Sequence, residues 1–504
     1  MNLLSQDKFL ELCQKGNLIP VYKEIMGDLD TPVSAYYKIA DKSKYSFLLE
    51  SVEGEEKIAR FSFLAKNPEL VIQCKNDKIK ISEAGKKSSS MKKMGLADTP
   101  LSVIREIMAK YKFVEVDDLP RFCGGLVGYL SYDVVRHFER LPQKTKDDLN
   151  LPDAYLMLAK DLIIFDHIHH KIKIISCVSV DPKSSTAQKI KLYKQAVKVI
   201  DSLIAELDQP LKAPKNKNGR TGAKSVELKV KSNFTEGHFK KIVTEAKKQI
   251  RAGEIIQVVL SQRFEVDLKT DPFHIYRALR AVNPSPYMYC LRFDGIQVIG
   301  SSPELLVRCE DGIVETRPIA GTRPRGKTEQ EDAALAKNLL ADEKEKAEHI
   351  MLVDLGRNDL GRVCQQGTVH LSEFMSVEKY SHVMHIVSNV KGKLKSSMDD
   401  FDVLRAAFPA GTVSGAPKIR AMEIIEDLES VKRGPYAGCI GYFSFSGNLD
   451  TCITIRTIVV HKNKAYVQAG AGIVADSNPQ KEYQETVNKA KAQIMAIELA
   501  HKQT

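Results

Sequence analysis

The chain has 504 residues, of which 43% are hydrophobic and 28% are charged, and its formal net charge is +11. These proportions are ordinary for a globular protein, and the length suffices for one large domain or two. No apolar run approaches the roughly 18 residues of a membrane-spanning helix, and no nucleic-acid-binding motif accompanies the positive charge, so we expect neither a membrane protein nor a nucleic-acid-binding protein.

The first residues of the chain indicate a helix and not a targeting signal. Residues 1–17 place Asp and Glu among their hydrophobic residues, which is typical of an amphipathic helix. The nine cysteines are scattered, and none belongs to a CxxC pair, which indicates free thiols in a reducing compartment. We therefore expect a cytoplasmic protein.

The first 207 residues consist largely of short apolar runs between turn residues, which is the pattern of β-strands. A Lys- and Ser-rich segment, 85–97, predicts a loop within this pattern. The elements that we expect are strands within 20–84, a helix at about 99–112, a glycine-rich strand within 120–139, strands at 156–167 and 171–180, and a helix at about 184–207.

Residues 208–232 are polar, basic and poor in aromatic residues, which predicts a flexible linker between an amino-terminal region, 1–207, and a carboxy-terminal region, 233–504. Many strands, several hairpins and helices in separate blocks favour an α+β fold over a doubly wound parallel sheet. The elements expected after the linker are helices at 233–253 and 272–282, strands at 255–266, 287–293 and 296–302, a helix from 417, strands at 436–445, 452–460 and 464–469, and a final helix from 479.

Residues 316–363 contain the first candidate functional residues, a pair of glutamates. Its beginning predicts a tight turn, and residues 328–355 predict one helix that starts with a capping pattern. Glu345 and Glu348 lie three residues apart on that helix, so both carboxylates occupy one face. Such a pair is either a solvated acidic face or one side of a cation site.

Residues 466–498 repeat the pattern. A strand leads into Gly470, and Ser477 or Asn478 then caps a helix whose first residue is a proline. On this helix Glu482 and Glu485 again lie three residues apart. Two helices that each present a glutamate pair can hold Mg²⁺, which prefers oxygen ligands and commonly uses one or two carboxylates.

Three long motifs identify a family. They are PIAGT at 318–322, DEKEKAEHIMLVDLGRNDLGRV at 342–363 and GAGIVADSNPQKEYQET at 470–486. Together they resemble the chorismate-utilising enzymes, and within them the large subunit, component I, of the anthranilate synthases. The resemblance extends from about residue 20 to 498 and implies two large antiparallel sheets stacked face to face with helices outside. It also implies an enzyme that catalyses the first step of tryptophan biosynthesis.

The resemblance assigns roles to the glutamates. It implies that Glu348 and Glu485 ligate Mg²⁺, with Glu345 and Glu482 behind them, and that the metal holds the ring carboxylate of chorismate. The alternative is that all four are solvated.

A second carboxylate of chorismate needs a cation. Arg456 lies among apolar and β-branched residues, where a charge needs a partner, and its guanidinium suits a carboxylate. The resemblance implies that Arg456 and Tyr436 hold the enolpyruvyl carboxylate together with the backbone of Gly470, Ala471 and Gly472, which we expect to form an anion-binding turn. The alternative for Arg456 is an internal ion pair.

Further site residues follow from the same resemblance. Glu304 would be the general acid at the leaving hydroxyl group, which requires a raised pKa. His385 would act near the enolpyruvyl group, and Gly321 and Thr322 would contact the substrate, Thr322 among the catalytic residues. Lys418 is a weaker candidate that could merely orient the start of its helix.

Two positions discriminate between chorismate chemistries. Relatives that add water carry a lysine base where this chain has Gln257, and relatives that make aminodeoxychorismate carry a lysine in place of Ala320. Both differences predict attack by ammonia followed by loss of pyruvate, which gives anthranilate. The hypotheses that remain are an aminodeoxychorismate synthase and a binding subunit without catalysis.

The resemblance also implies an inhibitor site for tryptophan. Glu50 would meet the ammonium group, Ser51 would belong to the same site, and Pro286, Tyr287 and Met288 would pack against the indole. Cys290 stands where the family usually has an aromatic residue. The alternative is a strand end beside a proline-rich turn.

The chain has no room for a glutamine amidotransferase domain, because the resemblance covers nearly all of it. We therefore expect a separate amidotransferase subunit, component II, to supply ammonia from glutamine. The family's usual assembly is a heterotetramer of two large and two small subunits.

Overall fold

The structure is a computed structural model. It describes residues 3–40, 43–51, 60–86, 91–95, 98–211, 228–380 and 383–502. No helix in these ranges is long and apolar enough to cross a lipid bilayer. All nine cysteines are buried free thiols, as the scattered spacing predicts.

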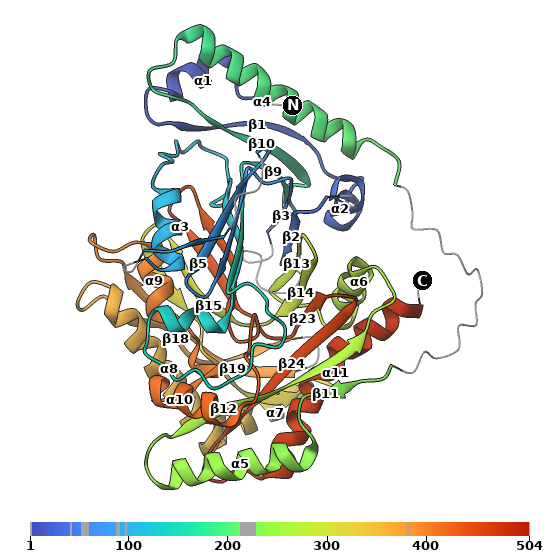
Figure 1. The fold of residues 1–504 in the computed structure, drawn as a ribbon, viewed down its shortest axis with the longest axis vertical. Coiled ribbons are helices and arrows are strands. Elements are labelled where there is room, and N and C mark those ends of the chain that lie inside the picture. Colours follow the sequence, from blue (N-terminus) through green and yellow to red (C-terminus); the bar gives the residue numbers. More distant parts are fainter. Residues whose placement is uncertain are drawn as a thin grey trace.

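Two 12-stranded sheets, whose described strands all pair antiparallel, form the body of the molecule (Figure 1). The first sheet contains, in spatial order, β1 (Leu18–Met26), β10 (Lys171–Ser179), β9 (Asp161–Asp166), β3 (Phe61–Lys66), β2 (Ser46–Glu50), β13 (Tyr287–Phe293), β14 (Ile296–Ser302), β23 (Thr457–His461), β24 (Lys464–Ile473), β12 (Gln257–Asp267) and β11 (Lys231–Ser232), with β20 (Gly415–Ala416) also paired to β12.

The second sheet is built the same way. It contains β17 (Ile319–Pro324), β19 (Val383–Lys393), β16 (Ile313–Thr316), β15 (Leu305–Glu310), β22 (Leu449–Ile453), β21 (Cys439–Ser444), β7 (Gly125–Leu130), β8 (Ala154–Ala159), β4 (Leu70–Lys75), β5 (Lys78–Glu83) and β6 (Lys92–Lys93), with β18 (His370–Lys379) also paired to β19.

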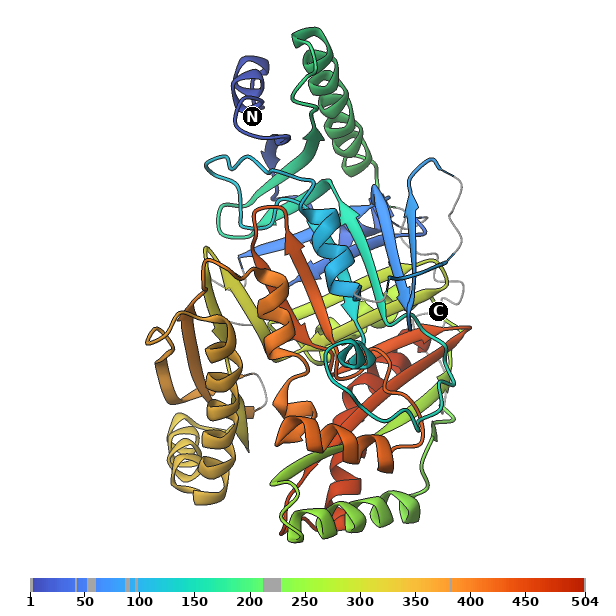
Figure 2. The ribbon, with the colours of Figure 1, turned by 60° about the vertical axis from the view of Figure 1, so that its left-hand side comes forward.

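Helices cover the outer faces of both sheets, and α7, α8, β18 and β19 (gold in Figure 2) gather on one flank. The helices α1, α2, α4, α6 and α11 pack on the first sheet, α3, α8 and α9 lie on the side of the second sheet, and α5 and α10 lie against β12. Their bounds are α1 (Gln6–Leu12), α2 (Pro32–Ala40), α3 (Pro100–Met108), α4 (Thr186–Leu207), α5 (Glu236–Arg251), α6 (Pro272–Val282), α7 (Glu329–Ala341), α8 (Glu343–Val363), α9 (Asp400–Ala407), α10 (Lys418–Leu428) and α11 (Pro479–Lys502), with short 3-10 helices η1 (Tyr132–His137) and η2 (Gly411–Val413).

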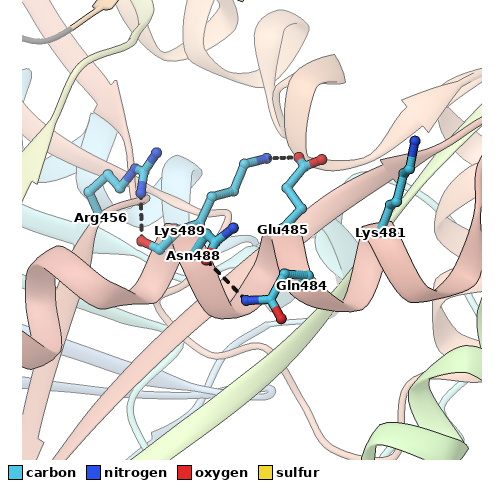
Figure 3. Close-up of a pocket in the computed structure, with 6 residues that line it drawn as sticks. All are labelled: Arg456, Lys481, Gln484, Glu485, Asn488 and Lys489. Atoms are coloured by element: carbon cyan, nitrogen blue, oxygen red, sulfur yellow. Dashed lines mark hydrogen bonds and ion pairs between the residues drawn. The ribbon is translucent and has the colours of Figure 1, made fainter. Parts of the chain in front are cut away.

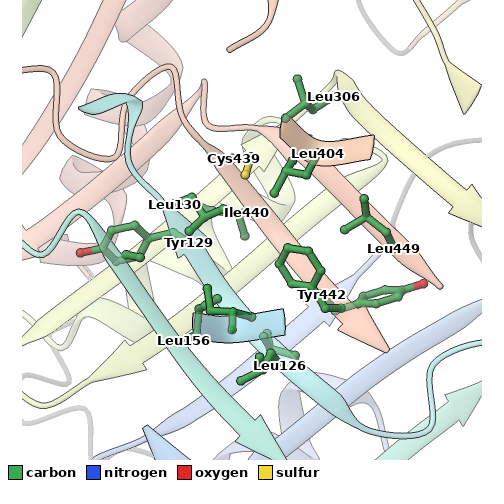
Figure 4. Close-up of a cluster of buried hydrophobic side chains, with 14 of the residues drawn as sticks. Leu126, Tyr129, Leu130, Leu156, Leu306, Leu404, Cys439, Ile440, Tyr442 and Leu449 are labelled. Carbon is green, nitrogen blue, oxygen red and sulfur yellow. The ribbon is translucent and has the colours of Figure 1, made fainter. Parts of the chain in front are cut away.

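Aromatic side chains join the facing sides of the two sheets. Tyr155 of the second sheet stacks on Phe293 of the first with ring centroids 4.2 Å apart, and Phe63 meets Tyr442 at 6.3 Å. Side chains of a strand alternate between its two faces. Along β13, Tyr289, Leu291 and Phe293 therefore enter the core between the sheets, while Met288 and Cys290 enter the core beneath the helices. Figure 4 shows part of a buried hydrophobic cluster around the second sheet, which includes Tyr129 of β7, Tyr442 of β21 and Leu404 of α9.

The predicted α+β fold with two stacked antiparallel sheets is confirmed. The regions 1–207 and 233–504 each contribute strands to both sheets, so the segment between them does not separate two cores. Lys231 and Ser232, at the end of the predicted linker, form β11, and residues 212–227 lie outside the described ranges.

Two predictions for residues 316–363 are wrong. The expected tight turn is strand β17, which has a bulge at Gly321, where φ is 68°. The expected single helix is two, because Asp342 leaves the helical conformation and its side chain accepts hydrogen bonds from the N–H groups of Lys344 and Glu345. An aspartate that caps the next helix in this way ends the preceding one.

One further prediction is wrong in part. The expected strand 452–460 is interrupted at 454–456, where the chain leaves one sheet for the other. The strands expected within 20–84 are present as β1 to β5, and helix α2, whose buried face packs near β2 and β3, lies among them. At 454–456, tertiary contacts override a local pattern of apolar residues.

Candidate functional site

The site is organised by two places where the chain crosses between the sheets. Pro303 and Glu304 connect β14 to β15, and residues 454–456, which end in Arg456, connect β22 to β23. The crossings lie side by side, because Ile453 N–H donates to Glu304 O at 3.0 Å and Ser301 N–H donates to Arg456 O at 3.2 Å. One hydrogen-bonded junction therefore places an acid and a cation.

Glu304 has an environment that suits proton donation. Burial raises the pKa of its carboxyl group from 4.5 to about 7, while Thr412 of η2 and the charge of Lys489 oppose that rise. Glu304 lines a cavity of about 40 Å³. The sequence-based requirement for a raised pKa at Glu304 is thus met, and its cause is desolvation.

The four predicted glutamates come together between α8 and α11. Burial, and then the like charge of Glu345, raises the pKa of Glu348, to which the charge of Glu485 also contributes. Burial raises the pKa of Glu482, and Glu485 adds to that rise. The carboxylates of Glu345 and Glu485 disfavour the ionised form of Glu348, and Glu485 also disfavours that of Glu482, so a cation bound between the two helices would relieve this repulsion.

Lys489 is a member of the site that sequence reasoning missed. Its Nζ lies 2.7 Å from Glu485 Oε1 and donates to Gly470 O at 3.0 Å. Its charge also opposes the rise in the pKa values of Glu304, Glu348 and Glu482 that burial causes. The sequence did contain a signal for it. Lys489 follows Glu485 by four residues on a predicted helix, and residues at that spacing lie on the same face.

The donor set fits a hard divalent cation. Within the described part of the chain, no group of three or more His, Cys, Asp and Glu side chains is arranged to hold a metal ion. Glu348 and Glu485 nevertheless interact across the two helices, and two carboxylates are enough for Mg²⁺ when water and substrate supply the remaining oxygens. Glu345 instead bonds Arg323 at 3.1 Å, and burial raises the pKa of Glu482.

Arg456 has no carboxylate partner within ion-pair distance among the residues that the structure describes. Its Nη1 donates to Lys489 O at 2.5 Å, and burial lowers the pKa of its guanidinium group. Its φ of 52° is a left-handed conformation, which costs about 1–3 kcal/mol for such a residue and is typical of functional sites. The alternative of an internal ion pair is therefore not observed.

The segment from Gly470 to Gly472 belongs to strand β24 and is not the anion-binding turn that we expect from the sequence. It pairs with Val259–Ser261 of β12, and its backbone is extended. Gly470 still faces away from β12, because its carbonyl group accepts from Lys489, so its N–H points the same way. The two glycines leave room for side chains, since a Cβ on Gly470 would lie 2.7 Å from the Tyr436 hydroxyl and one on Gly472 would lie 2.4 Å from Gln257 Nε2.

His385 sits at the bulge of β17. Its Nδ1 lies 2.8 Å from Gly321 O and 3.2 Å from Thr322 Oγ1. Because a carbonyl oxygen only accepts, Nδ1 carries the proton and Nε2 is left to exchange one with a ligand. Burial lowers the pKa of His385, and so does the nearby charge of Arg456.

The two specificity candidates differ in position. Gln257 is buried at the start of β12 and hydrogen-bonds Glu348, so it lies beside the acidic group. Ala320 is buried in β17 next to Gly321. Lys418 instead pairs with Asp359 at 3.0 Å and joins α10 to α8, which agrees with an orienting role.

The candidate inhibitor residues lie elsewhere in the first sheet. Glu50 of β2 pairs with Met288 of β13, so the structure brings the two predicted segments together. The carboxylate of Glu50 is buried, accepts a hydrogen bond from Tyr276 and lies 3.4 Å from Arg280. Cys290 is on the same face as Met288 and faces Tyr36.

Beside the acidic group, an open groove of about 460 Å³ runs along α11. This volume is in the range of small-molecule sites. Arg456, Glu485 and Lys489 line it, and Figure 3 shows Lys489 reaching toward Glu485. The remaining lining residues are Lys481, Gln484 and Asn488.

Comparison with known proteins places this site in a family. Residues 44–495 match the family model described as chorismate binding enzyme. The chain is 52% identical to anthranilate synthase component 1 of Acetivibrio thermocellus, with 98% of both chains covered, and 48% identical to that of Aquifex aeolicus, with 99% of both covered. It superposes on the crystal structure of anthranilate synthase component I from Streptococcus pneumoniae with a TM-score of 0.76 at 39% identity, covering 93% of this chain and 98% of that one.

The raised pKa of Glu304 predicts a pH dependence of stability. A group whose pKa is higher in the folded state stabilises the fold at low pH and loses that contribution as pH rises through the folded pKa. Relative to Glu304→Gln, the wild type should therefore lose up to about 3 kcal/mol between pH 4.5 and a pH above 7. Urea unfolding of both proteins across this range measures it, and a difference that stays constant or grows with pH would contradict the assignment.

Proposed function

Because the chain belongs to the family of chorismate binding enzymes, we propose that it is the large subunit of an anthranilate synthase and converts chorismate and ammonia to anthranilate and pyruvate. The two relatives named above, which match along nearly their whole length, carry that name. The reaction is the first step of tryptophan biosynthesis.

The observation that carries the proposal is the arrangement of charge along the groove. Arg456, without a carboxylate partner among the described residues, lies near the Tyr436 hydroxyl, and Glu485 approaches Glu348 from the facing helix. Chorismate has two carboxylates. Arg456 and Tyr436 receive the enolpyruvyl carboxylate, with the N–H groups of Gly470 and Gly472 beside them, and the ring carboxylate faces the acidic group.

A ring carboxylate beside glutamates needs a cation between them. Glu348 and Glu485 would hold Mg²⁺, with Glu345 and Glu482 behind, and the bound ion would polarise the ring carboxylate as a Lewis acid. Lys489, which now bonds Glu485, supplies part of the compensating charge.

Proton transfer falls to two residues. With a pKa of about 7, Glu304 is partly protonated at neutral pH and can donate its proton to the departing ring hydroxyl group. His385 keeps its Nδ1–H on Gly321 O, so its Nε2 exchanges a proton near the enolpyruvyl group. Thr322 and Gly321 position that imidazole and contact the substrate.

The choice of nucleophile rests on residues 257 and 320. Gln257 has no basic nitrogen, so it cannot deprotonate water, and Ala320 has no amine that could attack the ring. Ammonia is itself a neutral nucleophile and needs only a dry, oriented pocket.

Regulation and supply complete the proposal. Tryptophan binds near the paired strands β2 and β13, at a site to which the resemblance assigns Glu50, Ser51, Pro286, Tyr287 and Met288, and it inhibits the enzyme. A separate glutamine amidotransferase subunit delivers ammonia, in a heterotetramer of two large and two small subunits. The free cysteines agree with a cytoplasmic location.

The paired glutamates predict a metal requirement. Chelation with EDTA should abolish turnover, and Glu348→Gln or Glu485→Gln should lower it about 100-fold or more because a direct ligand is lost. Glu343→Gln, at the exposed start of α8, is the matched control and should keep wild-type rates. Initial rates of chorismate consumption during a Mg²⁺ titration measure the effect. Full activity in EDTA would remove the metal from the proposal.

Ala320 and Gln257 together predict the product. Purified protein with chorismate, Mg²⁺ and an ammonium salt should release ortho-aminobenzoate and pyruvate in equal amounts, and glutamine should not replace ammonium without the partner. Ala320→Lys should lose most activity, because a long side chain overpacks a buried strand position. Chromatography with mass detection separates the ortho and para isomers. A para product or accumulated aminodeoxychorismate would favour the aminodeoxychorismate synthase alternative.

The pairing of Glu50 with Met288 predicts tryptophan binding. Tryptophan should raise the melting temperature and inhibit turnover, because it binds the folded state alone, and Ser51→Phe should weaken both effects by filling the site. Thermal scans and inhibition curves measure this, with tyrosine as the ligand control. If tryptophan at millimolar concentration alters neither quantity, the inhibitor site is not present.

A further inference from the structure

A fully buried ion pair lies next to Tyr436, one of the proposed substrate-binding residues. Arg433 and Glu429 expose only 2% and 3% of their side chains. Arg433 Nε donates to Glu429 Oε2 at 2.9 Å, and its Nη2 donates to Oε1 at 2.6 Å, which makes a two-pronged contact. Among the described residues, the hydrogen bonds and ion pairs of Arg433 and Glu429 do not involve Lys489 or Glu485, and neither residue has a role in the proposed chemistry.

The pair ties together segments that are distant in sequence. Arg433 Nη1 donates to Val413 O at 2.7 Å, and Nη2 donates to Val259 O at 2.7 Å. Glu429 Oε1 accepts from the backbone N–H of Ser261 at 2.8 Å and from its hydroxyl at 2.9 Å. The end of α10, the strand β12 and the short helix η2 therefore meet at one charge pair.

Each of these segments carries a residue of the site close to its contact. Val259 lies two residues after Gln257, and Val413 follows Thr412, which interacts with Glu304. The guanidinium of Arg433 also lies near two aromatic rings. It is 5.7 Å from the ring centroid of Tyr436 and 4.8 Å from that of Tyr132. A cation within about 6 Å of an aromatic ring is attracted to its face, so Tyr436 is held as well.

We propose that Arg433 and Glu429 are positioning residues that set the spacing of Tyr436, Gln257 and Thr412 around the substrate. The inference rests on the proposed function, because it assigns the pair a role in that site. A guanidinium presents its N–H donors in a rigid planar fork, so it holds a carboxylate and two carbonyl groups at fixed angles. An apolar pair could fill the same volume but could not fix those directions.

Stability and positioning can be separated by a pair of apolar substitutions. Removing one partner of a buried ion pair leaves an uncompensated charge, whereas replacing both by apolar residues is often neutral or stabilising. Arg433→Met and Glu429→Leu alone should each lower the melting temperature. The double variant should regain most of that loss. Its KM for chorismate should nevertheless stay at least tenfold above wild type and its kcat at least tenfold below.

The pH profile adds a readout that a structural role alone would not move. The hydrogen bond of Thr412 lowers the pKa that burial gives to Glu304. The double variant loses the Arg433 hydrogen bond to the carbonyl group of Val413, the residue after Thr412. The limb of the kcat profile that reports Glu304 should therefore shift to higher pH. Arg433→Lys gives a second test that keeps the charge pair. It should melt close to wild type and still raise KM, because an ammonium cannot reach both carbonyl groups and the carboxylate.

The matched control is the ion pair of Arg136 and Glu426, whose side chains are 11% and 5% exposed and whose Nη2 and Oε2 atoms lie 2.5 Å apart. Glu426 lies one turn before Glu429 on α10, and Arg136 belongs to η1. Arg136→Met with Glu426→Leu should leave KM and kcat unchanged. Titration calorimetry measures the affinity for chorismate directly and does not depend on which product the wild type makes. A failure of the proposed function is therefore distinguished from a failure of this inference. Wild-type kinetics in a stable Arg433→Met, Glu429→Leu double variant, or in Arg433→Lys, would overturn the inference.

Discussion

The hydrogen bonds between the two sheet crossings are the constraint on which the site depends. A chain that passes from one sheet to another must leave its ladder, and at that point backbone groups need new partners. Here the crossings satisfy each other, through Ile453 N–H on Glu304 O and Ser301 N–H on Arg456 O. An acid and a guanidinium are thereby placed by the same contacts that hold the two sheets at their junction, so the fold and the site cannot change independently.

The acidic residues around this junction lie close to one another, and Arg456 has no carboxylate partner among the described residues. Both features suit a substrate with two carboxylates. Like charges and burial push the pKa of Glu348 upward, and burial does the same for Glu304, while Arg456 keeps its charge with a backbone carbonyl as its contact. Lys489 mediates between the two sides, since it bonds Glu485 and Gly470 O. A dicarboxylate with a divalent cation would complete both halves at once, which explains why the site tolerates so many ionisable groups at close range.

Helical spacing and capping are local properties, so the sequence allowed the two glutamate-bearing helices to be predicted. The stacked antiparallel sheets and the need for a raised pKa at Glu304 were expected from the family resemblance, which left burial and nearby carboxylates open as the cause. The sequence did not allow the strand at 319–324 to be predicted, since that strand exists through pairing with 383–387, which is far along the chain. The break at Asp342 and the left-handed Arg456 were missed for the same reason: a cap and a crossing are defined by what the next segment contacts. Lys489 was within reach of the helical spacing, whereas Thr412, Arg433 and Glu429 join the site through tertiary contacts.

A crystal structure of the Glu304→Gln variant with Mg²⁺ and chorismate tests the central claim most directly. The variant removes the proton donor and should trap the substrate without disturbing the junction. The account predicts the enolpyruvyl carboxylate on Arg456 and Tyr436, and the ring carboxylate joined through the metal to Glu348 and Glu485. Chorismate bound away from Arg456, or Arg456 paired with one of the glutamates while the substrate is present, would contradict it.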